Sequence, residues 1–104
     1  MNEGLTEPLL KALGRRIREL RTERGYSQEG FADKCGVHRT FMGTVERGES
    51  NLSFQNIVKV AASLDVTLSA LFQGLEGKAQ GLAAEAAGAK VSKPVRAKKR
   101  PAVR

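Results

Sequence analysis

The chain has 104 residues and a mass of 11.2 kDa, which allows one ordinary domain with one modest core. Its 18 lysines and arginines outnumber 11 acidic residues, and the net charge of +7 favours a polyanionic partner such as nucleic acid or an anionic membrane surface. One cysteine and one histidine cannot form an internal disulfide or supply the four ligands of a structural zinc site. Disulfide scaffolds and zinc fingers are therefore excluded, and we expect no metal and no cofactor.

No apolar run approaches the roughly 20 residues that span a bilayer. The sequence also begins with the acidic stretch MNEG instead of a basic leader followed by an apolar segment. From these two observations we expect a soluble cytoplasmic protein that makes no membrane contact.

An amphipathic helix is predicted over about residues 8–24. Its apolar side chains recur at helical spacing within one arc, at Leu9, Leu10, Leu13, Ile17 and Leu20. Thr6 is predicted as the N-cap with Pro8 in the first turn, and Gly25 stands where a left-handed residue ends a helix.

Four shorter helices follow, and no segment keeps the period-two alternation of a half-buried strand. Ser27, Ser53 and Thr67 are the predicted N-caps of the second, fourth and fifth helices. We expect the four phenylalanines and the apolar residues of the last two helices in the core, namely Phe31, Phe41, Phe54, Ile57, Val58, Ala61, Leu64, Leu68, Leu71 and Phe72. The predicted fold class is all-α, a five-helix bundle.

The composition changes after Phe72. Residues 74–89 are rich in glycine and alanine, and residues 90–104 hold two prolines and no acid. Such a segment cannot bury enough apolar surface to offset the entropy lost on ordering. We therefore expect a folded domain over residues 9–73 and a flexible, disordered basic tail over residues 74–104. A weak helix over residues 75–87 is the alternative, because leucines and alanines at 75, 79, 82 and 86 share one stripe, although glycines disfavour it.

Residues 28–47 have the spacing of a helix-turn-helix. A helix of about eight residues, a three-residue break and a helix over about residues 38–47, closed by Gly48, follow one another directly. Helices that cross over so short a turn need a small residue where they approach, which Ala32 supplies. They also need a residue that enters left-handed backbone angles cheaply, which Gly36 supplies. Apolar residues at 37, 42 and 45 then hold the two helices together, and the combination is specific.

The third predicted helix has two chemically different faces. At about 100° per residue, Arg39, Thr40 and Thr44 fall on one side and an apolar set at 41, 42 and 45 on the other. The major groove of B-DNA admits an α-helix, in which arginine donates two hydrogen bonds to guanine and threonine bonds a base edge or touches a thymine methyl. We predict that these three residues read bases. The alternative is an ordinary solvated helix face.

Five further positions are predicted to contact the DNA backbone. Ser27 and Gln28 stand at the start of the second helix, where helix N-termini favour anions. Arg47 and Asn51 follow the reading helix and can hold the same strand, and His38 precedes that helix and touches either solvent or phosphate. Such contacts position the protein on the duplex but do not specify a sequence.

The segments SQEGFADKCGVHRTFM at 27–42, VERGE at 45–49 and LDVTLSALF at 64–72 resemble the helix-turn-helix family of Cro and the phage repressors, also called the xenobiotic-response-element type. The resemblance covers about residues 9–72. It implies a five-helix DNA-binding domain in which Gln28 contacts phosphate and orients neighbouring groups, with the three residues above at base-reading positions. Short members of the family include phage repressors and controllers of restriction–modification operons.

Two positions depart from the family pattern. Gly30 stands where the family commonly has an acidic or polar residue, which removes a capping-box partner for Ser27. His38 stands where serine or threonine often precedes the reading helix, so the cap of that helix is an open question.

The predicted function is sequence-specific transcriptional regulation, by a repressor or an autoregulatory controller associated with the nucleoid. We expect a homodimer on double-stranded DNA with a pseudo-palindromic operator, formed through Leu68, Leu71 and Phe72. An antitoxin-like module that binds a partner protein is the alternative, and sequence-independent coating of nucleic acid by the tail is a third interpretation. One histidine on a reading helix disfavours an enzyme, and residues 73–104 offer no pocket for a small-molecule ligand.

The excess positive charge lies mainly in the predicted tail. Residues 1–73 hold 10 basic and 9 acidic side chains, whereas residues 74–104 hold 8 and 2. We therefore expect the tail to add nonspecific phosphate contacts to those of the folded domain.

Overall fold

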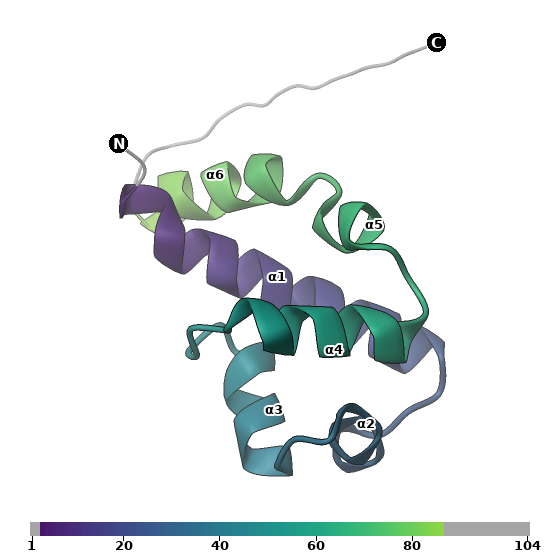
Figure 1. Ribbon diagram of the computed structural model, residues 1–104. Helices are drawn as coiled ribbons and strands as arrows, with labels where there is room; N and C mark the ends of the chain where they lie inside the picture. Colours follow the sequence, from purple (N-terminus) through teal and green to yellow (C-terminus); the bar gives the residue numbers. More distant parts are fainter. Residues whose placement is uncertain (1–2, 87–104) are drawn as a thin grey trace, which may run out of the picture.

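The computed structural model describes residues 3–86, and the regular structure in that range is helical (Figure 1). The helices, in chain order, are α1 (Glu3–Glu23), α2 (Gln28–Cys35), α3 (Arg39–Glu46), α4 (Phe54–Leu64), α5 (Leu68–Phe72) and α6 (Leu75–Ala86). The all-α bundle and its five helices are confirmed, and a sixth helix follows them. Within the described range no single helix has the length and apolarity of a membrane span, and only α4 joined to residues 68–85 across a 100° bend meets both criteria.

The core draws one large, fully buried side chain from each of the first five helices, namely Ile17, Phe31, Met42, Leu64 and Leu71. Smaller apolar residues fill the space between them, including Ala32 at 0% exposure where α2 and α3 approach. In Figure 1 α6 runs alongside α1, while α2 and α3 lie on the opposite side of the molecule. The helix-turn-helix therefore stands at one end of the bundle with its outer face open.

Side-chain caps begin three of the helices as the sequence predicts. The hydroxyl oxygens of Ser27, Ser53 and Thr67 each accept a hydrogen bond from the backbone N–H three residues later, at 2.9–3.1 Å. Each bond satisfies one of the N–H groups that a helix start leaves without a partner. The beginnings of α2, α4 and α5 are thereby fixed.

The predicted start of the first helix is wrong. Helix α1 begins at Glu3, so Thr6 lies inside it and is not its N-cap, and Pro8 lies inside the helix, beyond its first turn. Leu5 and Leu9, on either side of that proline, pack against the core. Tertiary packing thus extends the helix past a residue that lacks the backbone N–H.

The expectation that the chain is flexible beyond residue 73 is wrong for Leu75–Ala86, which form α6. Leu75 is 3% exposed and Ala79 0%, because both pack against α1 as part of the core. Burial against a neighbouring helix outweighs the helix propensity lost at Gly77 and Gly81. The remaining residues of the predicted tail, 87–104, lie outside the described residues.

Three residues predicted in the core, two phenylalanines and a valine, are exposed. Phe54 is 67% exposed, Phe72 is 38% exposed, and Val58, one turn after Phe54 on α4, is 41% exposed. The apolar arc of α4 is wider than its contact with the bundle, so only the side with Val60 and Leu64 is buried. The uncovered side is an apolar surface on α4.

Candidate nucleic-acid interface

The turn between α2 and α3 is closed by backbone hydrogen bonds. Gly36 has left-handed angles (φ 76°, ψ 31°), which an L side chain disfavours. Its N–H donates to the carbonyl of Asp33 at 3.1 Å, and the N–H of Val37 donates to the carbonyl of Ala32 at 3.0 Å. This double closure ends α2 and directs the chain into α3.

Helix α3 presents the two faces that its sequence predicts. Met42 and Val45 are buried at 0% and 3% exposure, whereas Arg39 and Thr40 are exposed and Thr44 is half-buried. The outer face therefore carries a guanidinium and hydroxyl groups above an apolar support.

His38 caps this helix. Its Nδ1 accepts a hydrogen bond from the backbone N–H of Thr40 at 3.1 Å, and its backbone has extended angles. Histidine thus does what serine or threonine does at other helix starts, which answers the question that the sequence leaves open. The predicted contact of His38 with phosphate stays a prediction.

Each arginine of the predicted DNA surface pairs with a carboxylate. The Nη1 atom of Arg39 lies 3.2 Å from Oε1 of Glu29 on α2, and the Nε atom of Arg47 lies 3.1 Å from Oε1 of Glu49 in the following loop. Both pairs are exposed, with side-chain exposures of 55–64%. Exposed pairs of this kind contribute about 0–1 kcal/mol, so both guanidinium groups remain available to a stronger partner.

Thr44 and Gly43 shape the centre of the face. The hydroxyl of Thr44 donates to the carbonyl of Phe41 at 2.7 Å and also contacts the Ser50 hydroxyl. A Cβ atom on Gly43 would lie 3.3 Å from Nη1 of Arg47 and 3.4 Å from the Gln28 side-chain oxygen. Glycine at this position lets both polar side chains lie over the helix.

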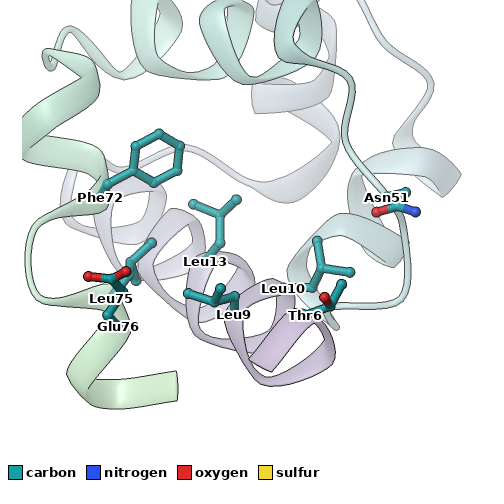
Figure 2. Close-up of a pocket in the computed structure, with 8 residues that line it drawn as sticks. All are labelled: Thr6, Leu9, Leu10, Leu13, Asn51, Phe72, Leu75 and Glu76. Carbon is teal, nitrogen blue, oxygen red and sulfur yellow. The ribbon is translucent and has the colours of Figure 1, made fainter. Parts of the chain in front are cut away.

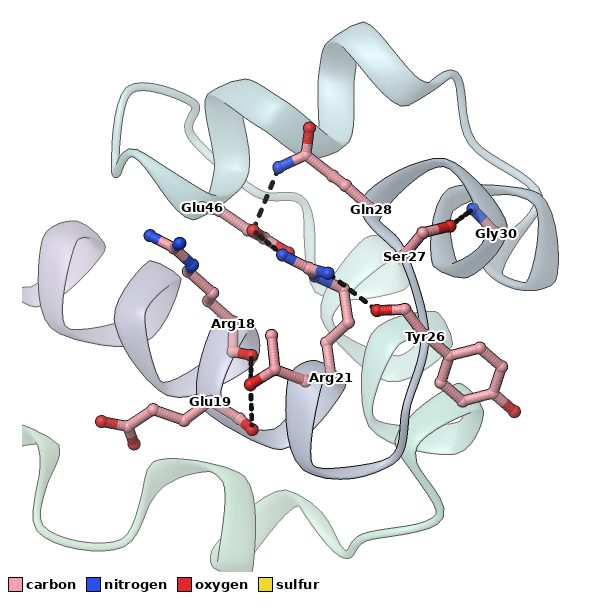
Figure 3. Close-up of polar contacts among 9 residues, drawn as sticks. Arg18, Glu19, Arg21, Tyr26, Ser27, Gln28, Gly30 and Glu46 are labelled. Carbon is pink, nitrogen blue, oxygen red and sulfur yellow. Dashed lines mark hydrogen bonds and ion pairs between the residues drawn. The ribbon is translucent and has the colours of Figure 1, made fainter.

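A buried carboxylate links the ends of three helices (Figure 3). Glu46 of α3 accepts from Nε of Arg21 at 2.7 Å, from Nη2 of the same arginine at 3.0 Å and from Nε2 of Gln28 at 3.0 Å. The Nη1 group of Arg21 also donates to the backbone carbonyl of Tyr26 at 2.8 Å. This network fixes α1, the start of α2 and the end of α3 relative to one another.

The network also orients the side chain of Gln28. Because a carboxylate accepts but does not donate, the Nε2 atom of Gln28 must face Glu46. The amide has two N–H groups, and one remains for another acceptor. Gln28 is therefore held at the start of α2 with a donor to spare.

Sequence reasoning missed Arg21 and Glu46. Both lie within the apolar arcs of their helices, since Arg21 follows Ile17 by four residues and Glu46 follows Met42 by four. They are 8% exposed each. Two opposite charges within two core-facing arcs are a sequence signal that predicts a buried pair.

Asn51 is exposed in the loop that follows α3. It lines a pocket of about 440 Å³ together with Thr6 and Leu10 of α1 and Phe72 at the end of α5 (Figure 2). The predicted contact of Asn51 with the DNA backbone stays a prediction.

The predicted dimerisation residues occupy different environments. Leu71 is 0% exposed and belongs to the core, so its assignment to a dimer contact is wrong: the short α5 turns this residue inward. Leu68 is half-buried against the core, and Phe72 is 38% exposed. Only the last of the three offers a large apolar surface.

No group of three or more histidine, cysteine or acidic side chains within the described range is arranged to hold a metal ion.

Comparison with known proteins identifies the family. A family model described as Helix-turn-helix matches residues 17–71, which is more than half of the chain. The chain belongs to this family. The resemblance to the Cro and phage-repressor type is thereby confirmed.

Relatives of this helix-turn-helix chain include regulators of several kinds. The control protein C.MunI of Mycoplasma sp. is 39% identical over 61% of this chain and 86% of its own length. The restriction–modification controller C.AhdI of Aeromonas hydrophila has a solved structure that is 48% identical, covers 61% of this chain and 96% of that one, and superposes with a TM-score of 0.59.

The regulator SinR of Bacillus subtilis is 40% identical over 57% of this chain, which spans 54% of that relative's length. A structure of SinR in complex with DNA is 39% identical over 59% of this chain and 98% of that one, with a TM-score of 0.56. These matches each cover about three fifths of this chain.

Proposed function

We propose that this helix-turn-helix protein is a sequence-specific DNA-binding regulator of transcription, acting in the cytoplasm as a repressor or an autoregulatory controller. The observation that carries the proposal is the two-faced α3, in which Met42 and Val45 anchor the helix and Arg39 and Thr40 are exposed on the outside. Arg39 reads guanine through two donors, and the threonines touch base edges or thymine methyls. The SinR complex with DNA and the controller proteins support this function by similarity.

Phosphate contacts flank the reading residues. The start of α2 presents backbone N–H groups and the spare amide N–H of Gln28, held in place by Glu46. Arg47, whose guanidinium lies over Gly43 beside the side chain of Gln28, supplies a charged donor at the C-terminal end of α3. Because these donors come from two helices, their contacts with the DNA backbone give α3 a defined register in the groove.

We further propose that two copies pair through α4 and α5. The apolar side chains left uncovered there, Phe54, Val58 and Phe72, are the exposed large hydrophobic residues of the described range. Burying them between copies removes apolar surface from water and places two reading helices on one duplex. The expected operator is a pseudo-palindrome with half-sites about one helical turn apart.

Selection from random oligonucleotides by the purified full chain tests the proposal. We expect recovery of a pseudo-palindromic sequence, and sedimentation of the free protein is expected to give a dimer that Phe54→Ser weakens. Arg39→Ala should then lose about 1–3 kcal/mol on the selected operator and relax the preference at one base pair. Recovery of no common sequence would overturn the proposal, and a stable complex with a different small protein would favour the antitoxin alternative.

A matched control separates base reading from loss of charge. Arg15 of α1 is exposed and lines a groove between α1 and α6, with Leu82 and Glu85. Arg15→Ala removes the same charge as Arg39→Ala but should leave the base preference unchanged. Equal losses of preference in the two variants would remove Arg39 from the reading role.

A further inference from the structure

Glu29 and Arg39 face each other across the helix-turn-helix. Glu29 lies in the first turn of α2, directly after Gln28, and Arg39 is the first residue of α3. Oε1 of Glu29 lies 3.2 Å from Nη1 of Arg39, and both side chains are 64% exposed. A carboxylate thus touches the residue that the proposed function assigns to base reading.

The contact with Glu29 leaves two donor nitrogens of the Arg39 guanidinium available to a base. Arginine has five N–H donors in a planar fork, and the carboxylate occupies one of its two terminal nitrogens. Nε and Nη2 remain as a parallel pair of donors, which matches the O6 and N7 acceptors of guanine. A contact on Nη1 therefore restricts the rotation of the long side chain without consuming the pair that reads the base.

The charge of Glu29 has a second consequence. A carboxylate on the face that meets DNA is repelled by phosphates of any sequence, so it lowers affinity for all duplexes alike. This repulsion changes affinity but cancels in the comparison of one sequence with another. Only the positioning of Arg39 by Glu29 therefore acts on sequence preference.

We propose that Glu29 is a positioning residue that sets the preference for guanine by holding Arg39. The inference rests on the proposed function of α3. A merely structural role for Glu29, in which its charge stabilises the positive N-terminus of α2, predicts altered stability but unaltered base preference. Loss of a positioning role therefore changes base preference, whereas loss of a structural role changes stability alone.

The test compares Glu29→Gln with Glu49→Gln, using the full chain and the operator recovered by selection. The two carboxylates are closely matched, because each is exposed and lies 3.1–3.2 Å from an arginine of the same surface. Arg47, the partner of Glu49, is assigned to the backbone. We expect Glu29→Gln to bind scrambled DNA more tightly and to lose about fivefold or more of its preference for guanine over other bases at the Arg39 position. Glu49→Gln should gain affinity for both DNAs and keep that preference.

A second background shows whether Glu29 acts through Arg39. In Arg39→Ala protein, the further change Glu29→Gln should leave the base preference unchanged, and thermal unfolding of each variant reports any structural effect. Retention of the guanine preference in Glu29→Gln, while the wild-type chain still selects an operator, would overturn this inference alone. Failure of the wild-type chain to select any sequence would overturn the proposed function and the inference with it.

Discussion

Arg21 of α1 and Glu46 of α3 form a buried two-point ion pair, with Nε 2.7 Å from Oε2 and Nη2 3.0 Å from Oε1. Their side chains are 9% and 4% exposed. Because the same carboxylate holds Gln28, the packing of α1 against α3 and the geometry of the proposed phosphate contact depend on one another.

Replacement of one member of this pair should destabilise the fold strongly. Arg21→Met leaves the Glu46 carboxylate buried with Gln28 as its remaining side-chain partner, and the free energy of unfolding should fall by about 3–5 kcal/mol. Urea unfolding at pH 7 measures the loss. The exposed pair offers a comparison, because Arg39→Ala should change stability by no more than about 0.5 kcal/mol.

Removal of both charges should restore most of the stability. The double variant Arg21→Met/Glu46→Leu fills the same space without a buried charge, and such replacements are often neutral or stabilising. Its DNA affinity should nevertheless be reduced, since Gln28 loses the acceptor that orients it. A double variant as unstable as the single one would contradict the assignment of the loss to an unpaired charge.

Gly14 should not tolerate a methyl group. A Cβ atom there would lie 2.5 Å from the carbonyl oxygen of Val45 and 2.6 Å from that of Glu46, both of which belong to the backbone of α3. Gly14→Ala therefore forces α1 and α3 apart and should cost about 1–3 kcal/mol or more. Gly81→Ala on α6 is the control, because nothing lies within 4 Å of its Cβ position, and it should stabilise by about 0.5–1 kcal/mol. Equal effects of the two changes on the thermal midpoint would argue against the close helix approach.

The local signals in the sequence predicted local structure well. Ser27, Ser53 and Thr67 cap helices and Gly36 turns the chain, because each of these roles depends on a few neighbouring residues. The face of α3 followed from helical periodicity for the same reason. Its assignment to DNA stays a proposal, since periodicity reveals an exposed polar face and not its partner.

The sequence-based errors concern packing between segments. When the neighbouring helix is unknown, a segment can be assessed only by its own helix propensity. The glycines of α6 therefore favoured a flexible chain, although Leu75 and Ala79 pack on α1. The same gap placed Phe54 in the core and gave Leu71, correctly predicted in the core, a dimer contact as well, because an apolar arc does not show which part of it meets the bundle. Only the arrangement of the helices decides such cases.

Cys35 should be unreactive in the folded protein. Burial raises the pKa of its thiol above the ordinary value, an effect larger than the opposing influences of Ser63, Lys34 and Lys59. Thiolate is the reactive form, so labelling by a disulfide reagent at pH 8 should be slow in buffer and fast in urea. Fast labelling of the native protein would contradict the buried position.

The raised pKa of Cys35 also predicts a dependence of stability on pH. The unfolded chain releases the thiol proton first as pH rises, so the contribution of Cys35 is intact below the unfolded pKa of about 8.5 and is lost as pH rises through the folded one. Between pH 8 and 10 the wild-type chain should therefore lose more stability than Cys35→Ala. Parallel losses in the two proteins would show that the thiol does not contribute.

The distribution of charge and the position of α6 suggest two truncated chains, one that ends before α6 and one that ends after it. Residues 1–86 hold 11 basic and 11 acidic side chains and thus carry no net charge, whereas residues 87–104 hold seven basic residues and no acidic one. A chain that ends after Gln73 loses α6, and with it the buried Leu75 and Ala79, so its thermal midpoint should fall. A chain that ends after Ala86 keeps this packing and should keep its midpoint.

Comparison of these chains separates folding from electrostatic binding. If the terminal basic residues contact phosphates, each contact adds about 0.9 to the slope of log affinity against log salt concentration. Truncation after Ala86 should therefore flatten the slope on operator and scrambled DNA alike, while the difference in affinity between the two DNAs is kept. Identical slopes for the full chain and residues 1–86 would show that the terminal basic residues do not contact DNA. A lost difference between operator and scrambled DNA would instead give residues 87–104 a part in sequence recognition.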